Sequence, residues 1–530
     1  MKDAVDPAVP SLQSKLSNPW HQPRSPTTVA RLIGGGAAIG LLADLFLRAS
    51  LPGLGWMLFV AGLCGAVVWL WTSENLLRLR CPELLGVIGV LGVMPFWRDA
   101  PLLTLLNIAT VLGLLVLVAA NPARRQLYYA DGGRLLSNFL NAIFSVVNGF
   151  FGFVGNDVHW LRLNDARTLR MVRRVFVSLL LTIPLVGVFF VLLRASDAGF
   201  SQLTAPLFDW DARAIMAHVL RFSVFAVFGL LLLRSQVFGP DWDARLVERP
   251  AKFQIGTIEV GIVLGSIGVL FTTFVLVQYR YLFGGSAFIQ ETLGLTYTEY
   301  CRDGFFELLA ISGLLFVIML MARWLTPVAN PRASTVLGAL SGLLIGLLYA
   351  MMASSFWRLY IYIDAFGLTE MRLYVAVFLV WMAFAFGWLG YRLMARRELP
   401  FFGVLLHSLL AALFALNAIN PHATVVRFNL ERAIDPAKAS TQFNRGKLDR
   451  AYLGSLGAEA VPVLVEALPR LNETQRADAL AILHRYYQRL GSESVDWRSW
   501  NLSRARARAA LEPILGELPP RELSRSYKSY

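Results

Sequence analysis

Long apolar runs, separated by short polar segments, dominate the first four-fifths of the chain. Eleven runs approach the roughly 20 residues that an α-helix needs to cross a bilayer. They cover residues 29–48, 53–72, 83–97, 100–119, 174–194, 214–233, 255–277, 304–323, 334–356, 373–392 and 400–419. The pattern predicts an all-α fold, a polytopic transmembrane helix bundle of about 11 spans. The third run is short, so it is either a tilted span or half of a tight hairpin with the fourth.

Polar regions flank this bundle and divide the chain into three parts. Residues 1–28 are polar and Pro-rich, which predicts a disordered cytoplasmic tail and no cleaved signal peptide. Residues 29–420 are the transmembrane bundle. Residues 421–530 have helical periodicity at 447–456, 458–469, 472–490 and 501–515. They predict a small HEAT-like helical domain, which has too few repeats to stand alone and must pack on the bundle or on a protein partner.

Composition supports the membrane assignment. Residues of the set AVILMFWYC make up 56% of the chain, charged residues only 16%, and the mean hydropathy is +0.55. Such a chain has too little polar surface for a soluble protein of this length and too much apolar surface for a disordered one. The net charge of +14 is typical of basic cytoplasmic loops, so it does not require nucleic acid as a partner. Membrane lipids are the expected partners.

The distribution of Lys and Arg predicts the orientation. If every run crosses once, the basic loops all lie on one side, with the densest at 121–173. The positive-inside rule then places the N-terminus in the cytoplasm and the C-terminal domain outside it, in a multi-pass protein of the bacterial inner membrane. A crossing by the apolar stretch 135–155 would invert every later loop. We therefore interpret 135–155 as an amphipathic or re-entrant segment on the cytoplasmic face.

The sequence lacks the familiar signatures of catalysis, cofactor binding and metal binding. The three cysteines have no metal-ligand spacing, so neither a zinc site nor a disulfide scaffold is predicted. Two sets of glycines favour close helix packing: Gly34, Gly35, Gly36 and Gly40 in the first run, and Gly261, Gly265 and Gly268 in the seventh. The basic run at 504–508 predicts a solvated helix face, with contact to anionic lipid headgroups as the alternative.

Ionisable residues inside the spans are candidates for function, because such residues are costly in a bilayer. The alternative is that each extends its polar group to the membrane interface. This set comprises Asp44, His218, Arg221, Glu259 and His407.

Two segments predicted to lie outside the cell carry a second set of charges. They are YTEYCRDGFFEL at 297–308 and WRLYIYIDAFGLTEMRLY at 357–374, the latter around a turn at Gly367. The candidate residues are Glu299, Arg302, Asp303, Glu307, Arg358, Asp364, Glu370 and Arg372. The set is open to two interpretations, a ligand-binding site or structural ion pairs within an aromatic interface belt.

These two segments also carry a family resemblance. The stretches 297–308 and GLTEMRLY at 367–374, with NPHATVVRFNLERA after the last span, resemble the bacterial multi-pass membrane family called domain of unknown function 4173. The resemblance covers about residues 170–460, and Cys301 and Asp303 depart from its pattern. It implies a membrane location and a helical fold, and it transfers no catalytic residue.

Three functions remain open at this point. The first is a non-enzymatic protein of the cell envelope that binds a lipid, a small solute or a protein partner through the external polar cluster. The second is a transporter, although no inverted repeat is visible. The third is a polytopic enzyme acting on a lipid-linked substrate, to which external carboxylates and arginines would be suited.

Overall fold

The computed structural model describes residues 26–48, 51–77, 81–120, 212–238, 256–283, 305–326, 331–394, 400–435, 448–492 and 496–518, with scattered residues between 178 and 200. Within these ranges every regular element is a helix. Eight of the described helices are long and apolar enough to cross a membrane, and the stretches Pro82–Trp97 and Ala310–Arg323 are shorter apolar helices. The protein is therefore an all-α, polytopic helical membrane protein.

Ten of the eleven apolar runs correspond to described helices. They are α2 (Pro26–Phe46), α3 (Leu54–Ser73), α4 (Pro82–Trp97), α5 (Pro101–Ala120), α10 (Ala212–Phe238), α11 (Thr257–Phe283), α14 (Phe305–Leu325), α15 (Pro331–Phe366), α16 (Glu370–Met394) and α17 (Phe401–Ile419). The predicted segment 135–155 and nearly all of the predicted tail lie outside the described residues, as does most of the run at 174–194. The short α4 forms a hairpin with α5, which is one of the two predicted alternatives.

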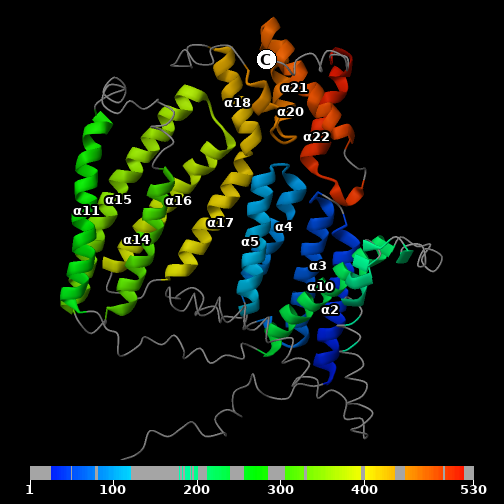
Figure 1. Ribbon diagram of the computed structural model, residues 1–530, viewed down its shortest axis with the longest axis horizontal. Coiled ribbons are helices and arrows are strands. Elements are labelled where there is room, and N and C mark those ends of the chain that lie inside the picture. Colours follow the sequence, from blue (N-terminus) through cyan, green and yellow to red (C-terminus); the bar gives the residue numbers. More distant parts are fainter. Residues whose placement is uncertain are drawn as a thin grey trace, which may run out of the picture.

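The bundle has two groups of helices. Helices α2 to α5 and α10 form one group, α11 and α14 to α16 form the other, and α17 lies between them (Figure 1). Each group has its own buried apolar core, and α17 contributes to both. Many large apolar side chains on the outside are exposed, such as Leu41 at 62% and Ile262 at 63%. An apolar exterior is what a helix bundle presents to lipid.

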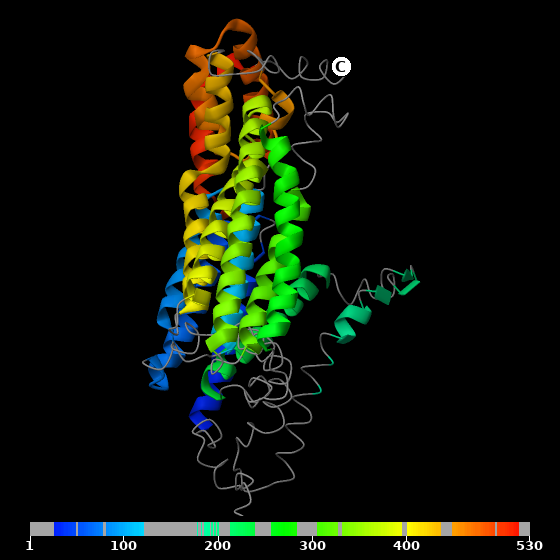
Figure 2. The ribbon, with the colours of Figure 1, turned by 90° about the vertical axis from the view of Figure 1, so that its left-hand side faces the viewer.

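The C-terminal helices sit together at one end of this bundle (Figures 1 and 2). They are α18 (Pro421–Ile434), α19 (Arg450–Leu453), α20 (Ala460–Ala467), α21 (Glu473–Ser492) and α22 (Leu502–Leu511). They enclose a separate apolar core. We refer to α18–α22 as the C-terminal domain and to the end of the bundle that carries it as the upper end.

Small residues bring α2 and α10 into close contact, as the sequence predicted for the first glycine set. A Cβ atom added at Gly40 would lie 2.7 Å from the carbonyl oxygen of Phe222, and one at Gly36 would lie 2.9 Å from that of Ala226. The second glycine set does not behave this way. No atom lies within 4 Å of a Cβ at Gly261 or Gly265, because α11 turns this face away from its neighbours.

The turn predicted at Gly367 is present, but the rest of the segment 357–374 is helical rather than a loop between the spans. Helix α15 continues to Phe366 and α16 begins at Glu370, so Gly367, at φ 79°, closes a turn of only three residues. With 36 residues, α15 is about 54 Å long, well beyond the roughly 30 Å of a hydrocarbon core. Its last turns therefore reach the C-terminal domain.

Candidate functional site

The C-terminal domain is joined to the bundle at the α4–α5 turn. The carbonyl groups at the end of α4 have no hydrogen-bond donors within the helix. Side chains from the C-terminal domain donate to them instead. The Asn501 amide donates to the carbonyl oxygens of Pro95 and Arg98, both at 2.8 Å, and the Ser503 hydroxyl donates to that of Trp97 at 2.7 Å. Residues more than 400 positions apart thus complete one helix end.

Asp99 connects the turn to two parts of the C-terminal domain. Its backbone N–H donates to Glu459 Oε1 at 2.5 Å, and its carboxylate accepts the backbone N–H of Ala458 at 3.0 Å. The same carboxylate lies 3.3 Å from Nε of Arg504, whose side chain is only 5% exposed. The expectation of a solvated face holds for Arg506 and Arg508, which are exposed, and is wrong for Arg504, which is buried.

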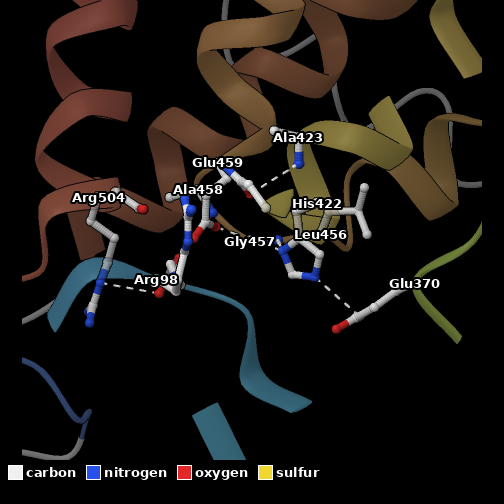
Figure 3. Close-up of polar contacts among 12 residues, drawn as sticks. Arg98, Glu370, His422, Ala423, Leu456, Gly457, Ala458, Glu459 and Arg504 are labelled. Atoms are coloured by element: carbon white, nitrogen blue, oxygen red, sulfur yellow. Dashed lines mark hydrogen bonds and ion pairs between the residues drawn. The ribbon is translucent and has the colours of Figure 1, made fainter. Parts of the chain in front are cut away.

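His422, at the start of α18, lies between two carboxylates (Figure 3). The backbone N–H of Gly457 donates to its Nδ1 at 2.8 Å, so Nδ1 carries no proton and the ring proton is on Nε2. Nε2 lies 3.1 Å from Oε2 of Glu370, and Oε2 of Glu459 lies 3.8 Å from Nδ1. With His422 only 1% exposed, this ring is a fixed connector between α16, α18 and the C-terminal domain.

We call this set, Asp99, His422, Gly457, Glu459, Asn501 and Arg504, the junction. Its polar groups pair with one another across the boundary between the bundle and the C-terminal domain. Such an arrangement fixes two parts of a protein relative to each other.

A cavity of about 340 Å³ lies beside the junction, at the α15–α16 turn. Its polar lining consists of Thr369, Arg372, Asn429, Arg432, Asp449 and Tyr452, and apolar residues such as Phe366 and Leu448 line the rest. Its volume is near the lower limit for small-molecule sites. The turn forms one wall, and α18 and α19 form the other.

Hydrogen bonds fix the walls of this cavity. The Asn429 amide pairs with both backbone polar groups of Leu368 at 2.8 Å, and the Tyr452 hydroxyl oxygen accepts the backbone N–H of Glu370 at 2.7 Å. Burial raises the pKa of Tyr452, so its hydroxyl keeps its proton and remains able to donate.

Two arginines line the cavity. Arg372 donates to the carbonyl oxygen of Gly367 and lies over the Tyr362 ring, with 3.9 Å between the guanidinium carbon and the ring centre. Arg432 pairs with Asp364 at 3.3 Å. Each guanidinium has five N–H groups, more than these contacts use. With Asp449, the charged residues that line the cavity sum to +1, and Asp364, which pairs with Arg432 beside the cavity, brings the local sum to about zero.

The structure gathers part of the predicted external cluster around these two features. Asp364, Glu370 and Arg372 lie there, and Arg358 is half-buried lower on α15. Glu299, Arg302 and Asp303 lie outside the described residues, and so does the side chain of Glu307.

The predicted intramembrane residues separate into two groups. Asp44, His218 and Arg221 come together at the upper end of α2 and α10. Glu259 is exposed near the start of α11, and His407 on α17 bonds to the carbonyl oxygen of Gly403 at 2.6 Å.

Several residues of the junction and cavity were not candidates from the sequence. Three of them, His422, Asn429 and Arg432, lie within the NPHATVVRFNLERA stretch, which carried part of the family resemblance. That stretch was the one available signal. For Asp99, Glu459 and Tyr452 the sequence offers none, because their partners lie far away along the chain, and for Arg504 it offers only the basic run 504–508, which was interpreted as a solvated face.

A family model described as "Domain of unknown function (DUF4153)" matches residues 85–467. The chain belongs to the DUF4153 family. The resemblance drawn from motifs was right about an uncharacterised family, but its number, 4173, is not supported. The DUF4153 match begins within α4, includes the cavity and the junction up to Glu459, and ends before Asn501 and Arg504. The chain matches no curated protein and no solved structure.

Proposed function

We propose that this DUF4153 protein is a multi-pass protein of the bacterial cell envelope that binds a small anionic ligand in the cavity at the α15–α16 turn. The observation that carries the proposal is the pair Arg372 and Arg432 on a hollow of about 340 Å³. Planar guanidinium groups bind carboxylate and phosphate through two parallel hydrogen bonds. Tyr452, Thr369 and Asn429 add polar atoms that could orient the rest of such a ligand.

Helix directions support an extracytoplasmic position for this cavity. Contacts between Arg31 and Glu74 mark the lower end of α2 and α3, and those between Phe46 and Trp497 mark the upper end of α2. Following the chain from there, helices α3, α10 and α16 each end at the lower end, where the connections to α4, α11 and α17 begin. Their sequences are rich in Arg and Lys, as cytoplasmic loops are.

The same reasoning supports the predicted number of crossings. Helix α5 ends at the lower end, where Val118 accepts a hydrogen bond from Gln236 near the end of α10. Helix α10 begins at the upper end, where His218 meets Asp44. The end of α5 and the start of α10 therefore lie at opposite ends of the bundle, as the predicted count of eleven spans requires.

The proposal is tested by identifying what the cavity retains. Wild-type protein, Arg372→Gln and Arg427→Gln would be purified in parallel, and co-purifying metabolites and lipids would be identified by mass spectrometry. Arg427 is an exposed residue of α18 outside the cavity lining, so its variant controls for loss of one charge. We expect at least one phosphate- or carboxylate-bearing compound to fall about tenfold or more in Arg372→Gln alone.

A second variant keeps the test independent of folding. Arg372→Lys retains the charge and loses the planar fork, so it should retain the compound at an intermediate level. Melting temperatures of all variants would show that each is folded. If every compound is retained equally by the wild type and by Arg372→Gln, the cavity is not the binding site.

A further inference from the structure

A second basic cluster lies on the other group of helices, at the upper ends of α2 and α10. Asp44 is at its centre, and its side chain is 14% exposed. Oδ1 of Asp44 lies 2.7 Å from Nδ1 of His218 and 3.0 Å from Nη1 of Arg221, and Oδ2 lies 2.8 Å from Nη2 of Arg48. We call these four residues the Asp44 cluster.

The charges of this cluster do not balance. Among the residues that the structure describes here, one carboxylate faces two arginines, which leaves a net charge of about +1. The neighbouring pair Asp496 and Arg498, at 3.2 Å, is neutral in itself, and Arg498 also donates to the carbonyl oxygen of Leu45. An uncompensated positive charge at the edge of a bilayer is costly unless an anion or water meets it.

The cations are accessible from the periphery of the bundle. The side chains of Arg48, His218 and Arg221 are 37%, 39% and 24% exposed. Their N–H groups outnumber the oxygens that Asp44 offers. An anion arriving from outside the bundle could therefore contact them without displacing the carboxylate.

Apolar side chains lie directly below these cations. Helix α2 runs toward the upper end and α10 runs away from it. Leu41, which precedes Asp44 by three residues on α2, and Val224, which follows Arg221 by three residues on α10, therefore both lie about one turn deeper in the bundle. They are 62% and 55% exposed. Above the cluster, Trp497 is 47% exposed and packs edge-on against Phe46, with 6.1 Å between ring centres. Exposed Trp side chains of this kind are typical of the interface between hydrocarbon and water.

We infer that the Asp44 cluster binds the phosphate of an anionic phospholipid in the leaflet at the upper end, with the acyl chains along Leu41 and Val224. A positive patch at headgroup level above exposed apolar side chains matches a phospholipid in both charge and shape. A free phosphate would match the patch alone. This site lies on α2 and α10, apart from the cavity at α15–α16, and does not depend on the proposed function.

Lipid retention measured by native mass spectrometry tests this inference. The full chain would be purified into mixed micelles that contain equal amounts of phosphatidylglycerol and phosphatidylcholine. We expect the wild type to retain phosphatidylglycerol in preference, Arg221→Gln to lose about fivefold of that preference, and the control Arg427→Gln to behave as the wild type. Asp44→Asn raises the net positive charge and should keep or increase the preference.

Several results would overturn the inference. The first is equal retention of the two lipids by the wild type. The second is the same preference for phosphatidylglycerol in Arg221→Gln as in the wild type. The third is an equal loss of that preference in Asp44→Asn and in Arg221→Gln. Displacement of phosphatidylglycerol by millimolar inorganic phosphate would indicate a phosphate site rather than a lipid site, and would also overturn it. If Arg221→Gln does not fold, Arg48→Gln, at the exposed end of α2, takes its place in the test.

Discussion

The junction and the cavity lie side by side at the upper end of the bundle, and both contain arginines, carboxylates and backbone polar groups. In the junction the groups pair at short distance, as Arg504 does with Asp99 and the backbone N–H of Gly457 does with His422. In the cavity, Arg372 and Arg432 line a hollow of about 340 Å³. The same types of residue therefore serve attachment in one place and can serve binding in the other.

This difference shows which observation distinguishes structure from function in a polar cluster. Residue type does not distinguish them, because both regions contain arginines and carboxylates. Pairing and an adjoining cavity do: an ion pair that joins two parts of a protein contributes to specificity of packing, whereas a guanidinium that lines a cavity and has N–H groups to spare can bind a ligand. Changes in the junction should consequently affect stability, and changes in the cavity should affect binding.

The largest effect is expected from Gly457→Ala in the junction. A Cβ atom there would lie 1.9 Å from the carbonyl oxygen of Asp99 and 2.7 Å from Nδ1 of His422, so the C-terminal domain would have to move away from the bundle. We expect a loss of about 3 kcal/mol or more in the free energy of unfolding, measured by thermal unfolding in detergent. Gly491→Ala in α21 is the control, because no atom lies within 4 Å of its Cβ. Equal melting temperatures for the two variants would contradict the account of the junction.

A smaller effect is expected from Arg504→Ala. It leaves Asp99, whose side chain is 28% exposed, without its buried partner, which should cost about 2 to 3 kcal/mol. Arg506→Ala, two residues along the same helix on its exposed face, should change stability by less than about 0.5 kcal/mol. Thermal unfolding of the two variants measures the difference. If Arg506→Ala is as destabilising as Arg504→Ala, the effect comes from the charge of α22 and not from the junction.

The smallest of these effects concerns Tyr486, which supports the segment between the cavity and the junction. Its buried hydroxyl lies 2.8 Å from the carbonyl oxygen of Leu453 and 3.1 Å from that of Leu456. Tyr486→Phe should cost about 1 kcal/mol. Burial raises the pKa of Tyr486, with the charge of Arg489 opposing it.

The pH dependence of this effect follows from the sign of the shift. A raised pKa means that the folded state holds its proton more tightly than the unfolded chain, whose tyrosine ionises near pH 10. The stabilising contribution is complete below pH 10 and is lost as the pH rises above it. The difference in melting temperature between the wild type and Tyr486→Phe should therefore narrow above pH 10, and a constant difference up to pH 11 would show that the hydroxyl is not buried as described.

Much of the fold could be predicted from the sequence because it depends on local patterns. Apolar runs of sufficient length predict helices, and prolines mark several helix starts, as Pro82, Pro101 and Pro421 do. The error at 357–374 has a physical cause. Aromatic and charged residues there indicated a loop, yet the helices extend beyond the apolar stretch because the C-terminal domain packs on them.

The sites could be predicted only in part, because they are built from distant residues. The predicted span boundaries placed Glu370 and Arg372 at the same end of the bundle as the C-terminal domain. They could not pair Glu370 with His422 or bring Arg432 to the same cavity as Arg372. Likewise, alternation in the basic run did not reveal that Arg504 faces the end of α4 while Arg506 faces outward. Such pairings depend on how helices dock, and a single sequence does not specify this.

The most direct test compares the two regions in one experiment. Melting temperature and retained small anionic compounds would be measured together for the wild type, Arg504→Ala and Arg372→Gln. We predict that Arg504→Ala melts several degrees lower and, when purified below that temperature, retains the compound. Arg372→Gln should lose the compound, and it should also melt lower than the compound-free wild type because it loses the hydrogen bond to the Gly367 carbonyl oxygen and the contact with the Tyr362 ring. If Arg372→Gln retains the compound at the wild-type level, the cavity is a structural feature and the central claim is wrong.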